Sequence, residues 1–256
     1  MGKKTKIDWC DSSINPVTGC LHGCEYCYAR GIATRFDGKA DRKPYPHVKG
    51  EPERFDLEWP VRREGRILAY PFGFAPTFHR YRLDEIQKWK GPRTIFVCSM
   101  ADLFGEWVPE EWIEAVFEAC QAAPQHRYLF LTKNPKRYLE LAGGIMPYGD
   151  NFWYGSSVTS PDMDRFGYNN YHTFVSIEPI LEPMGEKAHF IARDQDWIII
   201  GAETGNRNGK VIPERAWIDE IVEQARKYDK PVFMKETLRD LMGSDFVQEY
   251  PWRNGV

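Results

Sequence analysis

Three cysteines near the amino end of the sequence constrain this chain most. Cys20, Cys24 and Cys27 lie within eight residues of one another, at the spacing C-x-x-x-C-x-x-C. Thiolates favour iron-sulfur clusters, zinc or cuprous ions. A cubane of four irons usually takes four cysteines, so three cysteines leave one iron open to a substrate or cofactor.

Other uses of these cysteines stay open from the spacing alone. A structural zinc site needs a fourth ligand, for which His22 or Cys10 is available, although zinc sites usually use two spaced pairs. A thioredoxin-like pair of Cys24 and Cys27 leaves Cys20 without a role. A disulfide framework is the remaining alternative.

The composition is that of a globular α/β protein with enough apolar material for a core. The chain has 256 residues, of which 42 % are hydrophobic, 14 % aromatic and 28 % charged. Its net charge of -3 provides no basic stripe for a nucleic-acid backbone, although a local patch is compatible with it. We therefore expect a small-molecule substrate and regard nucleic acid as an unlikely partner.

The cysteine usage and the first residues predict a cytoplasmic location. Six cysteines occur, three of them clustered, which suits a reducing compartment better than a disulfide scaffold. Residues 1–6 contain no apolar signal core, and Lys6 stands where a myristoylation motif has Ser or Thr. No apolar run approaches the length of a membrane span, so we expect no membrane partner.

Apolar runs of strand length alternate with helical patterns along the chain, which is typical of parallel βα units. The expected strands cover residues 6–10, 94–98, 128–131, 152–155, 173–177, 197–200 and 231–234. The expected helices cover residues 28–36, 83–89, 109–122 and 213–228. We predict one domain over residues 1–256, with an irregular insertion at about 37–66 that is rich in charge, Pro and Gly.

Polar residues follow each expected strand from residue 94 onward. They are Ser99, Asp102, Thr132, Lys133, Ser157, Glu178, Glu203, Lys235 and Glu236. In a parallel barrel such strand ends converge on one mouth, where the loops build the site. Exposure alone also explains a polar residue at any single strand end, but the repetition favours a shared site.

The cysteine motif resembles that of the radical S-adenosylmethionine superfamily, in which an aromatic residue precedes the last cysteine, as Tyr26 does here. Further segments resemble a phage-associated family within that superfamily, formerly of unknown function. They are residues 76–84, 95–104, 131–135, 176–180 and 200–205. One branch of that family acts as queuine lyase in queuosine salvage. Ala202 replaces the second glycine of the usual Gly-Gly-Glu, and the cysteine loop is shorter than in many relatives, which suggests a specialised branch.

The resemblance implies a partial or full α/β barrel of about six to seven parallel strands, with a 4Fe-4S cluster and S-adenosylmethionine as cofactors. It assigns Cys20, Cys24 and Cys27 to the cluster. A group of residues is assigned to the cofactor: Tyr26, Ser99, Asp102, Thr132, Lys133 and Ser157. The expected chemistry is reductive cleavage of S-adenosylmethionine, followed by hydrogen abstraction from the substrate by a 5'-deoxyadenosyl radical. The electron is expected from a donor such as flavodoxin or ferredoxin.

For the substrate we predict a 7-deazaguanine base bound by Glu178, Glu203, Lys235 and Glu236, with Glu203 and Lys235 also catalytic. Carboxylates accept from adjacent N–H groups of such a base, and a lysine suits its carbonyl. Glu178 also suits a structural ion pair with Lys133 or Lys235.

Three classes of function therefore compete. The first is a radical lyase that cleaves the carbon-nitrogen bond of queuine. The second is a radical enzyme that repairs or modifies nucleic acid, as photoproduct lyases do. The third is a non-enzymatic metal-binding module.

Overall fold

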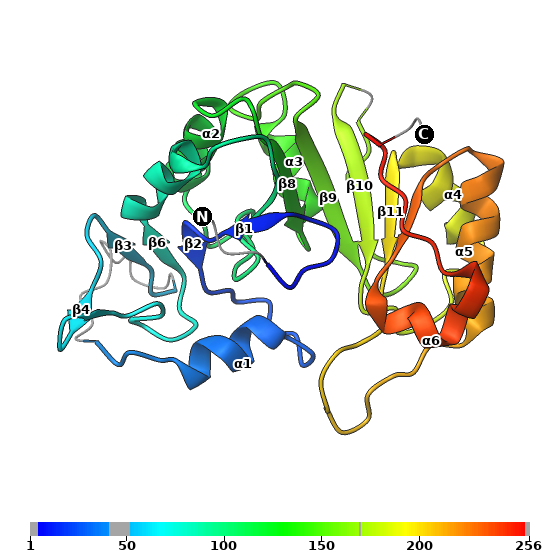
Figure 1. Cartoon of the computed structure of the whole chain (residues 1–256), viewed down its shortest axis with the longest axis horizontal. Helices are drawn as coiled ribbons and strands as arrows, with labels where there is room; N and C mark the ends of the chain where they lie inside the picture. Colours follow the sequence, from blue (N-terminus) through cyan, green and yellow to red (C-terminus); the bar gives the residue numbers. More distant parts are fainter. Residues whose placement is uncertain (1–4, 41–51, 169, 254–256) are drawn as a thin grey trace. The chain divides into compact units, whose positions relative to one another are not determined.

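The computed structural model describes residues 5–40, 52–168 and 170–253 of the chain (Figure 1). The chain divides into two units, one of Met1–Lys6 with Cys10–Pro147 and the other of Ile7–Trp9 with Tyr148–Val256. Residues 41–51 of the predicted insertion lie outside the described residues.

Three parallel strands organise the first unit. β7 (Thr94–Val97) pairs with β1 (Ser12–Ile14) on one side and with β8 (Arg127–Thr132) on the other. All four residues of β7 are buried, as expected for a central parallel strand. Ser12 lies opposite Ile95 in this register, and Thr94 lies opposite Arg127.

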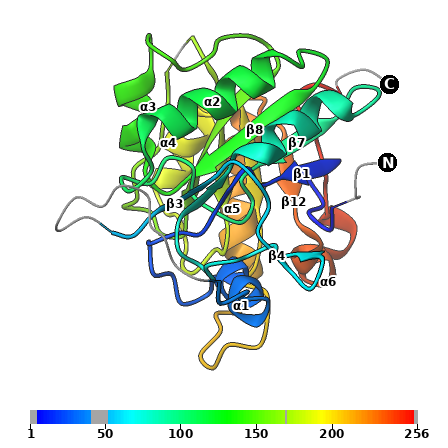
Figure 2. The same ribbon diagram turned by 90° about the vertical axis from the view of Figure 1, so that its left-hand side faces the viewer.

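The helices of the first unit are α1 (Tyr28–Arg35), α2 (Glu110–Gln121), α3 (Pro135–Leu141) and a 3-10 helix, η1 (Arg80–Lys88). In Figure 2, α2 runs along the β7 and β8 pair. It begins after Pro109 with Glu110 and Glu111 in its first turn, where acidic side chains complement the helix dipole. The predicted helix at residues 109–122 is confirmed, and its apolar face of Trp112, Val116, Phe117 and Cys120 is buried.

Five short strands complete the first unit. β2 (Val17–Thr18) pairs antiparallel with β6 (Thr77–His79), which also pairs with β3 (Phe55–Leu57) in parallel. β4 (Arg62–Arg63) and β5 (Arg66–Ile67) form an exposed antiparallel hairpin. The described part of the predicted insertion thus contains two regular strands, β3 and β4.

Four parallel strands organise the second unit. They follow the order β9 (Phe152–Val158), β10 (His172–Ile177), β11 (Trp197–Ile200) and β12 (Val232–Met234). Nearly every residue in them is buried, which explains why their sequences are continuous apolar runs rather than alternating ones.

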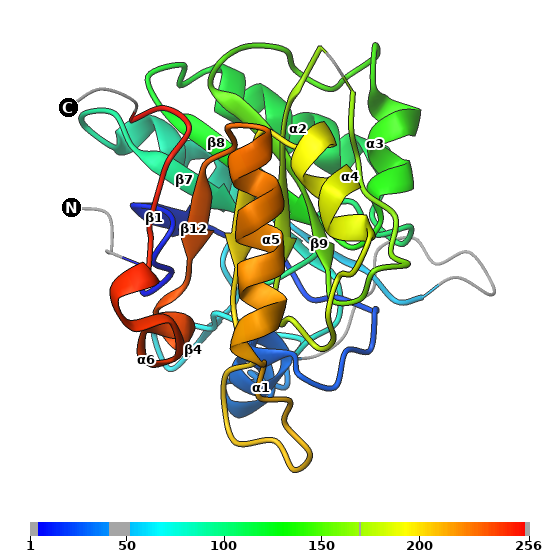
Figure 3. The ribbon, with the colours of Figure 1, turned by 90° about the vertical axis from the view of Figure 1, so that its right-hand side faces the viewer.

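Two helices, α4 (Lys187–Asp194) and α5 (Arg215–Lys227), lie side by side over the strands of this unit (Figure 3). Ile218, Ile221 and Ala225 of α5 are buried, whereas Trp217 and Val222 are only partly buried. Three short elements follow β12: η2 (Glu236–Leu238), α6 (Arg239–Met242) and η3 (Gly243–Asp245).

The prediction of a first strand at residues 6–10 is wrong, because the strand that pairs with β7 is Ser12–Ile14. Its sequence, Ser-Ser-Ile, carries too few apolar residues to show a strand pattern. Trp9 instead joins the aromatic core of the second unit, with ring centroids 6.1 Å from Phe174 and 6.3 Å from Trp197. Among the described residues, no helix has the length and apolar character needed to cross a membrane.

Candidate functional site

The three cysteines lie in the loop that joins β2 to α1 in the first unit. Cys20, Cys24 and Cys27 are half-buried free thiols. Cys27 is the N-cap of α1, and its Sγ accepts a hydrogen bond from the backbone N–H of Arg30 at 3.4 Å. The helix therefore begins directly after the last cysteine, so the predicted helix behind the cysteine loop is confirmed.

Gly19 determines how the chain enters this loop. Its φ is +89°, and a Cβ at this position would lie 2.3 Å from the carbonyl oxygen of Ala75. Only glycine accommodates both the left-handed backbone and so close an approach. The Gly19 N–H donates to the carbonyl oxygen of Met100 at 2.9 Å, so the first cysteine follows a fixed contact with the segment after β7.

Aromatic residues of the loop also contact the ends of β7 and β8. The Lys133 ammonium lies 5.4 Å from the centroid of the Tyr26 ring, and the Tyr28 hydroxyl donates to the carbonyl oxygen of Ser99 at 2.8 Å. A cation over an aromatic face is attracted by the ring quadrupole. Tyr26, Ser99 and Lys133, which were predicted to share one site, are thus brought together within the first unit.

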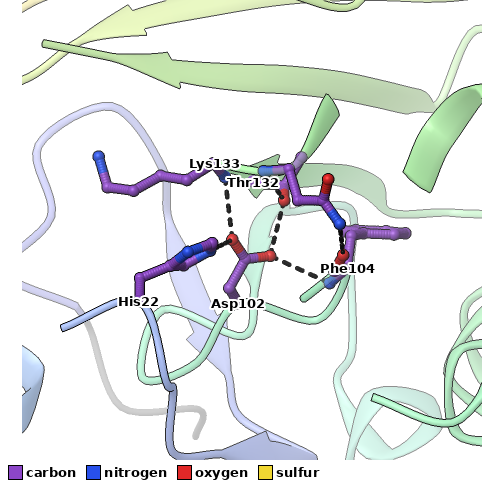
Figure 4. A network of polar contacts seen from close by, with 6 residues as sticks. His22, Asp102, Phe104, Thr132 and Lys133 are labelled. Atoms are coloured by element: carbon purple, nitrogen blue, oxygen red, sulfur yellow. Dashed lines mark hydrogen bonds and ion pairs between the residues drawn. The ribbon is translucent and has the colours of Figure 1, made fainter. Parts of the chain in front are cut away.

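Asp102 lies at the centre of a hydrogen-bond network (Figure 4). Its Oδ1 accepts from the Thr132 hydroxyl at 2.7 Å and from the Phe104 N–H at 3.0 Å. Its Oδ2 accepts from the Lys133 N–H at 2.9 Å and lies 2.7 Å from Nε2 of His22, inside the cysteine motif. Asp102 and Thr132, both predicted as cofactor ligands, are therefore engaged with the chain itself.

Asn15, which the sequence analysis did not single out, supports the turn after β7. Its Oδ1 accepts from the Met100 N–H at 2.8 Å and from the Ser99 hydroxyl at 3.2 Å. These bonds hold the turn after β7, in which Cys98 adopts a left-handed backbone with a φ of +62°. Asn15 directly follows β1, so the alignment of β1 with β7 is the only signal of its role.

The thiols of this loop are donors for a single soft ion or for an iron-sulfur cluster. Among the residues that the structure describes, no three His, Cys, Asp or Glu side chains are arranged to hold one metal ion. In a cubane each cysteine binds a different iron, so the sulfurs need not converge on one point. His22, the alternative zinc ligand, is hydrogen-bonded to Asp102 instead.

Burial raises the pKa of the Cys20 thiol to about 12. The backbone N–H of His22 opposes this shift, while the charges of Asp102, Cys24 and Cys27 add to it. The loop itself therefore does not stabilise a thiolate at Cys20, whereas coordination to a metal deprotonates a thiol.

An ion pair between Glu178 and Lys235 lies at the strand ends of the second unit. Glu178 follows β10 and Lys235 follows β12, and the two side chains are 24 % and 16 % exposed. Gly201 after β11 leaves room for the pair, because a Cβ there would lie 2.8 Å from Cδ of Lys235. The structure thus contains one of the ion pairs that the sequence suggested as an alternative to substrate binding.

Glu203 is paired with Arg207, a residue that the sequence analysis missed. The Arg207 guanidinium donates to both Glu203 oxygens, at 2.7 and 2.9 Å, and the Glu203 side chain is 1 % exposed. These hydrogen bonds lower the pKa of Glu203, although burial opposes them. In the sequence, the only indication of this pair was an Arg four residues after the Glu.

Two further residues of the second unit, Glu236 and Ser157, were predicted to belong to the site but make no described contact with either of these ion pairs. Glu236 is exposed and receives two hydrogen bonds from Arg239, at 2.7 and 2.6 Å, which lower its pKa. Ser157 lies within β9 rather than after it, opposite Ser176 of β10, and is 8 % exposed. Its predicted place beyond the strand is wrong, because β9 continues to Val158.

Three solved structures of one enzyme resemble this fold. Spore photoproduct lyase complexed with dinucleoside spore photoproduct gives a TM-score of 0.54 at 12 % identity, covering 92 % of this chain and 79 % of the lyase. A mutant lyase with the same dinucleoside gives 0.53 at 11 % identity, with coverages of 92 % and 79 %. Another mutant gives 0.52 at 12 % identity, with coverages of 91 % and 78 %.

This likeness and the seven parallel strands of the two units confirm the predicted fold class, an α/β partial barrel of parallel strands. No curated protein matches the sequence. Residues 4–239 match the family described as "Protein of unknown function (DUF5131)". With most of its length covered by that match, the chain belongs to this family.

Proposed function

We propose that this protein is a radical S-adenosylmethionine enzyme. The observation that carries the proposal is the cysteine loop of the first unit, whose three thiols lie within eight residues and whose neighbouring residues contact the segment after β7. The likeness in fold to spore photoproduct lyase supports it independently of the cysteines. A metal-binding module without enzymatic activity does not account for polar contacts that hold such a loop at the carboxyl ends of parallel strands.

In this proposal Cys20, Cys24 and Cys27 hold a 4Fe-4S cluster, which supplies reductive cleavage of S-adenosylmethionine when bound. Lys133 suits the cofactor carboxylate, since its ammonium lies over Tyr26 within the cysteine motif. Flavodoxin or ferredoxin is the proposed electron donor. Ser99 and Ser157 keep their proposed roles in cofactor binding, whereas Asp102 and Thr132 act by positioning the strand ends.

As substrate we propose a small modified base, with queuine lyase as the specific activity. The Glu178 and Lys235 pair offers one acceptor and one donor on neighbouring strand ends, which suits the N–H and carbonyl edge of a 7-deazaguanine. Glu203 keeps its charge beside Arg207, so it contributes a carboxylate only if the substrate competes with that guanidinium. Glu236, exposed and paired with Arg239, suits a peripheral contact with the amine of the base.

Nucleic acid is a second candidate substrate, favoured by two observations. The structures with similar fold contain a dinucleoside photoproduct. The exposed β4 and β5 hairpin carries Arg62, Arg63 and Arg66, and Trp59 just before it is 81 % exposed. Arginine with an exposed aromatic ring is a common surface for single strands. The expectation that nucleic acid is unlikely rested on net charge, which does not describe such a local surface.

The test is anaerobic reconstitution with iron and sulfide, followed by incubation with reductant and S-adenosylmethionine. We expect 5'-deoxyadenosine, formed faster with queuine and accompanied by a 7-deazaguanine product. Stimulation by dinucleoside spore photoproduct in place of queuine would select the second candidate. Absence of iron-sulfur absorption, together with one zinc per chain, would reject the enzyme class altogether.

A further inference from the structure

The hydrogen-bonding capacity of the Asp102 carboxylate is filled by the chain itself. A carboxylate offers about four acceptor positions. Four partners lie within hydrogen-bonding distance, namely Thr132, Phe104, Lys133 and His22. Asp102 is only 5 % exposed, so an additional ligand would have to displace one of them. These contacts suit a residue that positions other groups.

Three of these partners hold the carboxylate independently of the cysteine loop. Phe104 belongs to the segment after β7, and Thr132 and Lys133 lie at the end of β8. Asn134 braces both segments, because its N–H donates to the Thr132 hydroxyl oxygen and its side-chain amide donates to the Phe104 carbonyl oxygen, each at 2.9 Å. The carboxylate is therefore a fixed point on the strand ends.

His22 connects this fixed point to the metal-binding segment. It lies between Cys20 and Cys24 in the sequence, and its Nε2 is 2.7 Å from Oδ2 of Asp102. The ring also meets Trp107 in an edge-on contact, with centroids 4.9 Å apart and planes at 78°. The imidazole thus contacts both a carboxylate and an indole, and its side chain is 22 % exposed. This fixes the middle of the C-x-x-x-C segment.

We propose that His22 is a positioning residue, which transmits the fixed location of Asp102 to Cys20 and Cys24 and so arranges the loop before a cluster binds. The expected effect on iron binding rests on the proposed function. The positioning of the loop rests on the contacts of His22 with Asp102 and Trp107. Partners that orient metal ligands typically change metal affinity by about 10-fold to 100-fold when they are removed.

The experiment compares the parent with His22→Leu and His22→Gln. Leucine removes the hydrogen bond, whereas glutamine keeps a donor of similar reach. His172→Leu is the matched control, because His172 also contacts a carboxylate, Asp150 at 3.4 Å, but lies in the other unit. Two quantities are measured: the rate of iron loss from reconstituted protein to a chelator, and the alkylation rate of each loop cysteine in the metal-free protein at fixed pH.

We expect His22→Leu to lose iron about 10-fold faster and to alkylate severalfold faster at Cys20 and Cys24. His22→Gln and His172→Leu should resemble the parent. Equal rates in His22→Leu and the parent would overturn the proposal. Equal impairment of both His22 variants would also overturn it, because the imidazole itself would then be required. Failure of every protein to bind a cluster, with the alkylation difference intact, would instead reject the proposed function.

Discussion

The strand ends of the two units use ionisable side chains in opposite ways. In the first unit one buried carboxylate, Asp102, receives hydrogen bonds from backbone groups, a hydroxyl and an imidazole, and it has no Lys or Arg partner among the described ion pairs. In the second unit each predicted carboxylate is paired with a cation: Glu178 with Lys235, Glu203 with Arg207, and Glu236 with Arg239.

The Asp102 network of the first unit is rigid, whereas the Glu178 and Lys235 pair of the second unit can exchange its partners for a ligand. The Asp102 network connects the cysteine loop to the segments after β7 and β8. Moving these segments apart would break up to four hydrogen bonds to one buried carboxylate. An ion pair that is partly exposed, such as Glu178 with Lys235, exchanges partners more easily because water and ligands compete for both charges. In the proposed function the first unit holds the cofactor, and the exchangeable charges of the second contact the substrate.

The largest expected effect is the loss of cluster binding in Cys24→Ala. The fold should persist, because a half-buried loop thiol adds little to the core. We expect iron and sulfide to fall from about four each per chain to nearly none, since a cubane held by three cysteines depends on each one. Elemental analysis after anaerobic reconstitution measures this.

Cys10→Ala is the matched control, because Cys10 lies outside the C-x-x-x-C-x-x-C motif and was the alternative fourth zinc ligand. It should retain the full complement of iron. Equal metal loss in both variants would contradict the three-cysteine assignment.

Asp102→Ala should cost about 3 kcal/mol of unfolding free energy, because it leaves buried donors of Thr132 and Phe104 without their acceptor. Urea denaturation of the metal-free protein measures it. Asp219→Ala is the control, since that carboxylate is half exposed on α5 and should change stability little. A similar small change in both variants would show that the network does not stabilise the first unit.

Gly201→Ala tests how the ion pair of the second unit is accommodated. The new Cβ would lie 2.8 Å from Cδ of Lys235 and 3.3 Å from Cγ of Glu178, so one side chain must move. We expect a loss of about 1 kcal/mol in urea denaturation. Gly167→Ala is the control, because its nearest neighbouring atom would lie at 3.6 Å, an ordinary contact. Equal stability of the two variants would mean that Lys235 shifts without cost.

Glu203→Gln should lower the stability at neutral pH and make the stability less dependent on pH. Arg207 lowers the pKa of Glu203 in the folded protein, so the folded state keeps this carboxylate charged at a pH where the unfolded chain protonates it. The resulting stabilisation is present above the ordinary Glu pKa of about 4.3 and is lost as the pH falls through the lower folded value. Thermal midpoints measured from neutral pH to below this range should decline less steeply for the variant. If the thermal midpoints of variant and parent fell equally with pH, Glu203 would not contribute to the loss of stability in acid.

The smallest effect is expected for Glu236→Gln. This carboxylate and Arg239 are about half exposed, and solvent screens such pairs. The thermal midpoint should not change measurably, although affinity for a base with a cationic side chain should fall if Glu236 contacts it. A large loss of stability would show that Glu236 supports the segment after β12 rather than a ligand.

Several features could be predicted because they depend on neighbours in the sequence. The cysteine loop and the start of α1 follow from residues within one short segment, and the strands after residue 93 follow from continuous apolar runs. β1 was missed because its identity depends on pairing with β7, not on its own Ser-Ser-Ile sequence.

The sequence by itself determined which atoms are available for chemistry: three thiols on one loop and a series of polar strand ends. Only the tertiary structure decided their partners. His22 meets Asp102 across 80 positions and Glu178 meets Lys235 across 57, and no local pattern encodes such contacts. The physical reason is that hydrogen bonds and ion pairs act over a few ångströms, so which groups meet depends on strand register and on small residues such as Gly19 and Gly201.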